Sequence, residues 1–483
     1  MKKISALCLL VFAIFFSNAQ VLVSYSLQES FTKNQLDSVL SVTGFSLPIQ
    51  PQYGIDVYQV IYKTPYKHID SLVNVSGIVV IPKNATCPSA LGCYAHGSFS
   101  RRDQVPSYNG PERPIGFFFA GIGGVVTAMP DELGLGDSDT SVLIHTYINK
   151  FHSGHACVNI MRAARELAAT LSVPLSGEVA LTGYSQGGYT SMATAKLIEE
   201  SYANEFNIIA LAPMSGPYDL KVTMVDLMLS NSPYATPAYL PYLLLGYHSV
   251  YPSLQQKYPA PSQVLKHPYD SIIPPMLYSR NFTLDQVGQF CTQVPRQMII
   301  DSVIAEFEAD LNHPLRLILA ENDLLDWAPQ HPTKIAYCTA DEQVPYLNGV
   351  RADSAWNANN APDVQSQNFG ALNHGGCVEP ALTSAALYLI GKLSPCSVGF
   401  ANNEAATVKF RIFPNPSNGR FTLIKEGGQG IVTVFDVTGK AIYNTETYND
   451  SQVIDAGTLA PGIYLVQLTN ANNQTAFRKL IIE

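Results

Sequence analysis

The chain has 483 residues, and 47% of them are hydrophobic, which excludes a wholly disordered protein. This length favours two domains over one. The formal net charge is −9 at pH 7, and an acidic chain without a basic patch argues against nucleic-acid binding.

The first 19 residues have the three parts of a secretory signal peptide. Lys2 and Lys3 form the charged region, residues 4–16 form the apolar core, and residues 17–19 (Ser-Asn-Ala) form a small-residue cleavage site. No later apolar run is long enough to span a bilayer. We therefore expect a secreted protein whose mature chain, from residue 20, has no transmembrane segment.

Three β-rich runs follow in the first part of the mature chain. Residues 57–62 and 76–82 predict the antiparallel entry strands of a sheet, and residues 91–98 predict a strand that ends in a His-Gly turn. The backbone N–H groups of Gly97 and Ser98 lie at the end of that strand. They are candidate donors to the carbonyl oxygen of a substrate.

Residues 123–130 predict another buried strand, which leads into an acidic, glycine-rich loop over residues 131–138. No helix with phosphate-binding spacing follows this loop, so a nucleotide site is not expected. Apolar residues recur at helical spacing over residues 155–171, which predicts a helix that leads to the next strand.

A group of potential metal ligands stands near the start of that helix: His152, His155 and Cys157. No carboxylate set or second cluster accompanies them, as a zinc site would require. We interpret the group as a chance cluster and expect neither a metal nor another cofactor.

The motif Gly183-Tyr184-Ser185-Gln186-Gly187 has the Gly-x-Ser-x-Gly pattern of a nucleophile on a strand-to-helix turn. An apolar run over residues 179–182 predicts the strand, and residues 188–197 predict the helix. A Cβ at either glycine would collide with the neighbouring strand or helix. Ser185 is therefore the predicted nucleophile, and the N–H of Gln186 is a predicted oxyanion donor.

Strands and helices alternate from about residue 76, and residues 206–213 predict a further strand. This alternation predicts an α/β fold with a mostly parallel, doubly wound sheet. Residues 217–314 interrupt the alternation, because they are rich in proline and tyrosine and contain helix-like apolar runs. We expect them to form a helical cap whose underside lines a pocket.

An acid and a histidine follow in the second half of the chain. Residues 334–341 predict a strand that ends at Asp341, which we favour as the acid over Asp323 and Asp326. His374 is expected in a glycine-flanked loop before a helix over residues 380–393. The order Ser185, Asp341, His374 is that of α/β-hydrolase triads, in which the histidine takes the serine proton and the acid orients the imidazole.

The chain has eight cysteines, one of which, Cys8, lies in the signal segment. In an exported protein, disulfides are the expected state of cysteine. Cys87 and Cys93 could close a short loop. A bridge between Cys338 and Cys377 would tie the acid loop to the histidine loop. The sequence alone leaves the pairing open.

The C-terminal part has a different residue pattern. After the hydrolase domain, which we expect to span residues 20–398, residues 399–407 form a predicted polar linker. Residues 408–483 contain short β-rich runs with turn signals about ten residues apart, which is typical of a small immunoglobulin-like β-sandwich.

Residues 57–393 resemble the secretory-lipase-like α/β-hydrolases, which are serine esterases and lipases. The matching motifs are His96-Gly97, Met129-Pro130-Asp131-x-Leu133-Gly134-Leu135-Gly136, Gly183-Tyr184-Ser185-Gln186-Gly187-Gly188, Asn322-Asp323 with Trp327, Asp341-x-x-Val344-Pro345 and Asn373-His374. Glu132 departs from the pattern, because it stands where the family often has tyrosine.

Residues 408–483 resemble the C-terminal sorting domain of the type IX secretion system of Bacteroidetes. The matching residues are Pro414-Asn415-Pro416, Gly439-Lys440, Pro461-Gly462-Ile463-Tyr464 and Lys479. The resemblance implies export through the outer membrane by that machinery, then release or surface attachment, often with removal of the domain.

Together these features predict a secreted serine hydrolase that cleaves carboxylic esters through an acyl-enzyme. The ester could be a small molecule, a lipid or a side group of a polysaccharide. One alternative is a carbohydrate esterase that removes acetyl or feruloyl groups. Another is a prolyl-oligopeptidase-like serine peptidase, although no propeller-sized N-terminal domain is present. A catalytically dead binding protein is a further alternative, which the complete triad disfavours.

Overall fold

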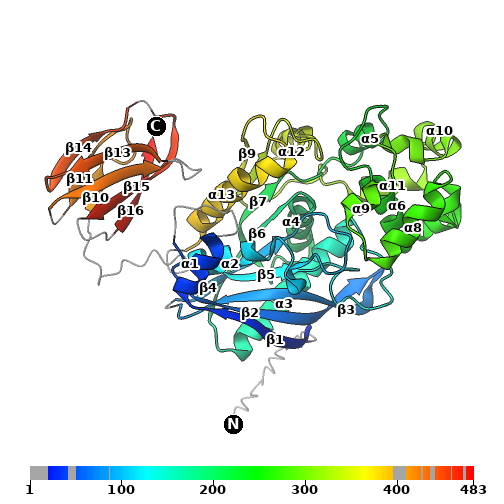
Figure 1. Cartoon of the computed structure of the whole chain (residues 1–483), viewed down its shortest axis with the longest axis horizontal. Helices are drawn as coiled ribbons and strands as arrows, with labels where there is room; N and C mark the ends of the chain where they lie inside the picture. Colours follow the sequence, from blue (N-terminus) through cyan, green and yellow to red (C-terminus); the bar gives the residue numbers. More distant parts are fainter. Residues whose placement is uncertain are drawn as a thin grey trace, which may run out of the picture.

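The computed structural model describes residues 20–41, 50–85, 87–394, 410–425, 428–435, 441–457, 459–470 and 475–482. The predicted signal peptide, the predicted linker and Cys396 lie outside these residues. Figure 1 shows a mixed α/β part, coloured from blue to yellow, and an all-β C-terminal part in orange and red.

The α/β part is built on a nine-stranded sheet with the order β1-β2-β3-β5-β4-β6-β7-β8-β9. The first strands pair antiparallel, and every pair from β5 to β9 is parallel. This confirms the predicted mostly parallel sheet with antiparallel entry strands. The strands are β1 (Leu22–Phe31), β2 (Ile55–Tyr66), β3 (His68–Pro82), β4 (Ser89–Ala95), β5 (Val126–Pro130), β6 (Leu175–Tyr184), β7 (Asn207–Met214), β8 (Thr333–Tyr337) and β9 (Val364–Asn368).

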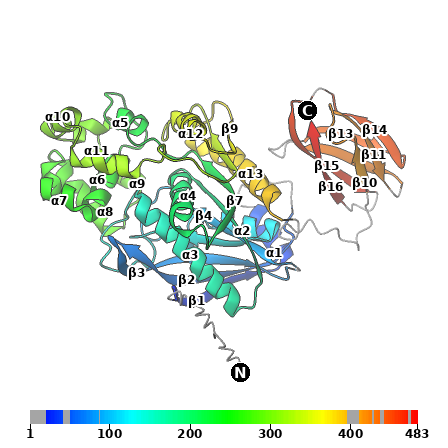
Figure 2. The same cartoon turned by 180° about the vertical axis from the view of Figure 1, so that it is seen from behind.

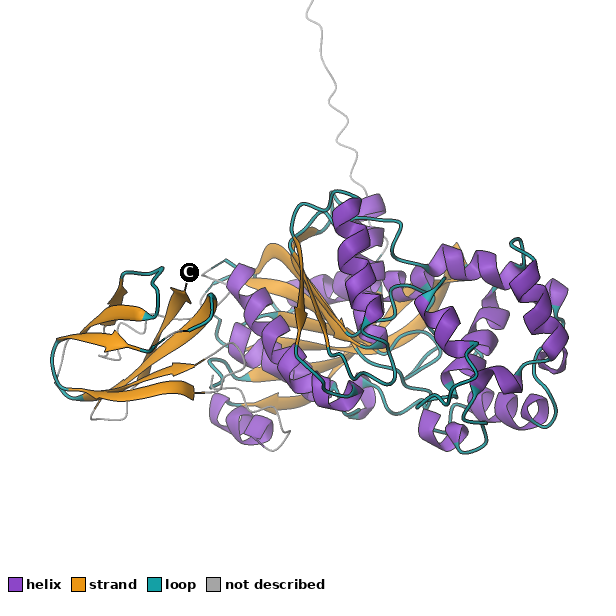
Figure 3. Cartoon of the chain, turned by 90° about the horizontal axis from the view of Figure 1, so that it is seen from above, coloured by secondary structure: helices purple, strands orange, loops and turns teal. Residues whose placement is uncertain are grey.

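Helices cover both faces of the sheet, as Figure 3 shows. One face packs against α1 (Lys33–Ser41), α2 (Arg113–Gly123) and α13 (His374–Lys392). The other face packs against α3 (Lys150–Thr170), α4 (Gln186–Leu197) and α12 (Leu347–Ala358). Because both faces are covered, the central strand β4 is buried along its whole length, as is usual for parallel sheets.

A helical cap occupies the chain between β7 and β8. Figures 1 and 2 both show its helices grouped together at one side of the sheet. The predicted cap, residues 217–314, ends at the first residue of the last of these helices and leaves the rest of that helix out. The cap helices are α5 (Thr223–Met228), α6 (Tyr239–Val250), α7 (Pro252–Lys257), α8 (Tyr269–Ser279), α9 (Leu284–Gly288), α10 (Asp301–Ala309) and α11 (Pro314–Asn322).

The last helix of the α/β part begins earlier than predicted. The predicted helix begins at Pro380. In the structure Pro380 lies inside α13, and the side chain of Asn373 caps the helix by accepting from the N–H of Gly376 at 2.8 Å. His374 is therefore the first residue of a helix and does not lie in a loop.

The C-terminal part consists of two antiparallel sheets, with the orders β10-β11-β14 and β13-β12-β15-β16. Apolar side chains from both sheets share one core, including Phe421, Val432 and Leu480. This fits the predicted small β-sandwich. Its strands are β10 (Phe410–Phe413), β11 (Arg420–Lys425), β12 (Gly430–Phe435), β13 (Ala441–Thr447), β14 (Ser451–Asp455), β15 (Gly462–Asn470) and β16 (Thr475–Ile482).

Candidate active site

Ser185 lies between the end of β6 and the start of α4, with φ 58° and ψ −120°. This left-handed conformation is strained for a residue with a side chain and must be held by its surroundings. The neighbouring glycines permit the turn, because a Cβ on Gly187 would lie 1.9 Å from the carbonyl oxygen of Ala95. The N–H of Ser185 donates to the carbonyl of Met214 at 2.9 Å, which fixes the turn to β7.

Asp341 and His374 are in direct contact. His374 Nδ1 lies 2.7 Å from Asp341 Oδ2, and only 1% of the Asp341 side chain is exposed. The other carboxylate oxygen accepts from the backbone N–H groups of Gln343 and Val344, at 3.0 and 2.8 Å. A neutral His374 that donates from Nδ1 presents the lone pair of Nε2, as a general base requires.

Two further links join this pair to its surroundings. The hydroxyl of Tyr184, the residue before Ser185, donates to the carbonyl of His374 at 2.6 Å. Cys338, just after β8, forms a disulfide with Cys377 in the first turn of α13. The acid loop, the histidine helix and the serine turn are thus tied together.

The other predicted disulfide is absent, because Cys87 and Cys93 are both free. Cys93 lies within β4, with its thiol buried on the α3 side of the sheet beside Cys157. Six residues of extended chain can span about 20 Å, whereas a disulfide needs Cα atoms within about 7 Å. A largely extended segment therefore keeps the two thiols apart.

The competing acids have other partners. Asp323 accepts from the backbone N–H groups of Leu220 and Leu325, at 3.0 and 3.1 Å, and pairs with Lys221 at 3.2 Å. Burial raises its pKa. Asp326 pairs with Lys196 at 2.9 Å. Asp323 thus joins the segment after α11 to the start of the cap, and Asp326 joins that segment to α4.

The candidate oxyanion donors need one correction. The N–H of Gly97 donates to the Glu112 carboxylate at 3.0 Å, so this amide is already engaged. Ser98 follows, and its hydroxyl bonds to the hydroxyl of Tyr147 at 2.8 Å. Gln186 is the first residue of α4, where backbone N–H groups lack helical partners. Gln186 and Ser98 therefore remain the candidate donors.

Two buried residues beside Gln186 carry no motif that identifies them. Glu132 and His145 both contact the Gln186 side chain amide, at 3.2 and 2.7 Å. Burial lowers the pKa of His145, which favours its neutral form. The departure of Glu132 from the family pattern is the one sequence signal that points to this group.

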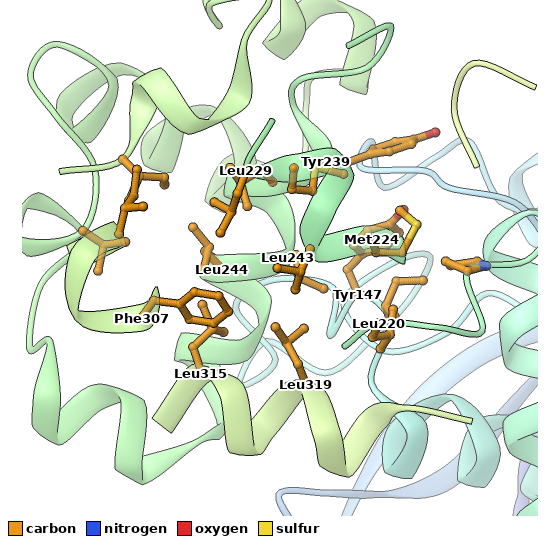
Figure 4. Close-up of a pocket in the computed structure, with 18 of the residues that line it drawn as sticks. Tyr147, Leu220, Met224, Leu229, Tyr239, Leu243, Leu244, Phe307, Leu315 and Leu319 are labelled. Carbon is orange, nitrogen blue, oxygen red and sulfur yellow. The ribbon is translucent and has the colours of Figure 1, made fainter. Parts of the chain in front are cut away.

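A cavity opens beside Ser185 and extends under the cap. The space open to water-sized groups is about 100 Å³. In Figure 4, Tyr147 and Leu220 lie at one end, and Phe307 and Leu315 lie at the other. Apart from Ser185 and Gln186 the lining is apolar or aromatic: Tyr147, Ile148, Pro217, Leu220, Met224, Val225, Met228, Leu229, Tyr239, Leu240, Leu243, Leu244, Val264, Ile299, Val303, Ile304, Phe307, Leu315, Leu319 and Val344.

The histidines near the start of α3 have structural partners. His152 accepts from the N–H of Lys67 at 3.2 Å, and burial lowers its pKa to about 3. His155 Nδ1 lies 2.7 Å from the carbonyl oxygen of Phe151. Across the described ranges, no three His, Cys, Asp or Glu residues are grouped as metal ligands would be. Within the same ranges, no helix has both the length and the apolar character needed to cross a bilayer.

The sheet order, the strand-to-helix turn at Ser185 and the Asp341–His374 pair define an α/β-hydrolase. Residues 123–386 match the family described as "Secretory lipase", and the chain belongs to that family. It is a hydrolase of the esterase and lipase class. Residues 411–483 match "Secretion system C-terminal sorting domain", which indicates a secreted or cell-surface protein that interacts with secretion machinery.

Solved structures support the same fold. A hydrolase from Legionella pneumophila is 23% identical and superposes with a TM-score of 0.68, covering 80% of this chain and all of that one. LipA from Xanthomonas oryzae, a rice cell wall degrading esterase, is 27% identical with a TM-score of 0.66 over 77% of this chain and 96% of its own. Candida antarctica lipase A is 18% identical with a TM-score of 0.56 over 79% and 84%.

A curated relative matches over a much shorter stretch. An endo-acting ulvan lyase from Formosa agariphila is 34% identical over 89 residues, which is 18% of this chain and 17% of that protein. The match therefore covers a small part of the lyase and carries none of its activity to this chain.

Proposed function

We propose that the protein is a serine hydrolase that cleaves carboxylic esters through a covalent acyl-enzyme, with Ser185, His374 and Asp341 as the catalytic triad. The 2.7 Å contact between Asp341 and His374 carries the proposal, because the hydroxyl of Tyr184 links that histidine to the turn that bears Ser185. The strained backbone of Ser185 supports the same role.

The reaction follows from these roles. His374 Nε2 takes the proton of the Ser185 hydroxyl as the oxygen attacks the ester carbonyl carbon. The N–H groups of Gln186 and Ser98 donate to the resulting oxyanion, and each such donor stabilises the transition state by about 3–4 kcal/mol. His374 then gives its proton to the departing alcohol. Water hydrolyses the acyl-enzyme by the reverse sequence of proton transfers.

The cavity supports an apolar acyl group as the part of the substrate that enters the cap. Its lining beyond Ser185 is aliphatic and aromatic, including Leu244, Phe307 and Leu319. Burial of each methylene of an acyl chain contributes about 0.8 kcal/mol. We therefore infer that kcat/KM rises with acyl length until the cavity is filled.

A second candidate is an esterase that acts on plant cell-wall material. The likeness to LipA from Xanthomonas oryzae, at 27% identity, favours it. Such a substrate would present an acetyl or feruloyl group to Ser185, whereas a lipid would present a long acyl chain. The two candidates therefore differ in the acyl group they prefer.

A panel of p-nitrophenyl esters from acetate to palmitate, together with a feruloyl ester and a prolyl amide, tests the proposal. We expect highest kcat/KM on the medium or long esters and loss of turnover in Ser185→Ala, with circular dichroism unchanged. Ester hydrolysis at the wild-type rate by folded Ser185→Ala would overturn the assignment. A preference for the feruloyl ester would favour the second candidate, and turnover of the prolyl amide would favour a peptidase.

A further inference from the structure

Glu132 is a buried carboxylate next to the serine turn that the proposed mechanism does not use. It lies just after β5, is 1% exposed and has a φ of 63°. A positive φ is uncommon for glutamate and requires the surrounding structure to hold it. The contacts of its side chain indicate what that conformation achieves.

The carboxylate of Glu132 accepts hydrogen bonds from two helices. Its Oε2 accepts from Gln186 Nε2 at 3.2 Å and from Ser153 Oγ of α3 at 3.1 Å. Its Oε1 accepts from Thr190 Oγ1 at 3.1 Å. Gln186 and Thr190 lie four residues apart on one face of α4. The carboxylate therefore clamps the first turn of α4 to α3.

The orientation of the Gln186 amide follows from these contacts. Its Nε2 donates to Glu132 and also to His145 Nε2, at 2.7 Å, while His145 Nδ1 lies 2.8 Å from the carbonyl oxygen of Leu133. The reverse orientation would place the amide oxygen of Gln186 against the carboxylate, where it could not donate. Both N–H bonds of the side chain are thus engaged, and the residue is held at its far end.

Two glycines of the same turn pack directly against neighbouring strands. A Cβ on Gly187 would lie 1.9 Å from the carbonyl oxygen of Ala95 in β4, and a Cβ on Gly188 would lie 2.5 Å from that of Met214 in β7. The strained backbone of Ser185 is thus flanked by close glycine contacts and by the hydrogen bonds between Glu132 and α4.

We propose that Glu132 is a positioning residue that, through the side chain of Gln186, keeps the backbone N–H of Gln186 directed at the oxyanion. This inference rests on the proposed serine mechanism, in which that N–H is a donor. Glu132 itself does not touch the substrate. Loss of Glu132 should therefore destabilise the transition state and change the affinity for the ester only slightly.

The neighbouring residue provides a matched control. Asp131 is also a fully buried carboxylate on the same loop, but it accepts from Ser76 Oγ at 2.5 Å and from the N–H of Ser107 at 3.0 Å. These partners lie on β3 and on the loop before α2, and neither belongs to α4. Loss of a buried carboxylate as such is therefore common to Asp131→Asn and Glu132→Gln, whereas loss of an acceptor oxygen that faces α4 is specific to Glu132→Gln.

The experiment compares these two variants in the full chain. We expect Glu132→Gln to lower kcat by about 10-fold or more, below the 10²- to 10³-fold cost of losing an oxyanion donor outright, with KM within about two-fold. The Ki of a trifluoromethyl ketone, to which the Ser185 oxygen adds to form an oxyanion, should rise by about 10-fold. The Ki of the matching alcohol, which forms no oxyanion, should stay the same. Asp131→Asn should keep kcat within about three-fold when folded.

A second variant keeps the test decisive if Glu132→Gln does not fold. Gln186→Met retains the backbone N–H but removes both side-chain bonds, so it should reproduce the loss of kcat. The double variant Glu132→Gln/Gln186→Met should lose no more kcat than the more strongly affected single variant, because both changes break the same contact. Additive losses, or a kcat within about three-fold of wild type in folded Gln186→Met, would overturn the proposal. Full activity of Ser185→Ala would instead show that the serine mechanism itself is wrong.

Discussion

The disulfide between Cys338 and Cys377 should stabilise both the fold and the histidine–acid pair. Its two cysteines are separated by 39 residues and are fully buried. In the chain-entropy description, closing a loop of this length lowers the entropy of the unfolded chain by about 13 cal/mol/K, or about 4 kcal/mol at 25 °C. The double variant Cys338→Ala/Cys377→Ala removes the bridge without leaving a lone thiol.

We expect this variant to unfold with a free energy about 4 kcal/mol lower than wild type. The α/β part has about 375 residues, so its unfolding entropy is about 0.8 kcal/mol/K and its Tm should fall by about 5 °C. Urea titration and thermal melting monitored by circular dichroism measure the two quantities. Cys291→Ala is the matched control, because Cys291 is a free, half-buried thiol in the cap, and its loss should cost less than about 1 kcal/mol.

The same variant separates stability from catalysis. The bridge joins the segment before Asp341 to the first turn of α13, where His374 lies. Without the bridge, kcat should fall while the p-nitrophenyl ester KM changes little. A free energy of unfolding within about 1 kcal/mol of wild type would refute the loop-closure argument. An unchanged kcat in a destabilised variant would show that the hydrogen bonds of Asp341 suffice to hold the pair.

Three further predictions concern single residues. Asp341→Asn should lower kcat by about 10²-fold or more, whereas folded Asp323→Asn should stay within about three-fold; the reverse ranking would reassign the acid. The pKa of His152 is about 3 in the folded chain and about 6.5 when unfolded, so its contribution to stability is complete above pH 6.5 and is lost as the pH falls toward 3. Between pH 6.5 and 5, urea titrations should therefore show wild type losing about 1.6 kcal/mol more than His152→Gln, and parallel profiles would contradict this. Leu244→Trp should narrow the cavity near Phe307. We expect it to lower kcat/KM on p-nitrophenyl palmitate by about 10-fold and on p-nitrophenyl butyrate by less than about three-fold. Equal losses on the two esters would show that the acyl chain binds elsewhere.

The sequence was most informative where a local pattern determines a local structure. The motif around Ser185 requires glycines for steric reasons, and the structure has the expected strand and helix on either side. The entry strands, the cap and the C-terminal sandwich follow from hydrophobic periodicity and from breaks in it. The sequence did not predict the edge strands β1 and β9 or the helices α2 and α12.

The errors arose where the outcome depends on a distant partner. The direction of the Gly97 N–H is set by Glu112, which lies on the segment that enters α2. Cys87 and Cys93 are close in sequence, but the extended strand β4 separates them. The role of Glu132 depends on Ser153, Gln186 and Thr190 together, and no local pattern predicts that these side chains meet at one carboxylate.

The proposed catalytic residues and the cavity lining therefore differ in how far sequence can determine them. A strained serine turn tolerates only glycine at certain positions, so its residues are diagnostic. An apolar cavity tolerates many side chains of suitable volume, so leucines and tyrosines in residues 217–314 indicate a lining but not its occupant. LipA and Candida antarctica lipase A share the fold at 27% and 18% identity, and a shared fold does not determine the substrate. The panel of p-nitrophenyl esters tests the cap directly. The dependence of kcat/KM on acyl length should follow the volume of the cavity beyond Leu244.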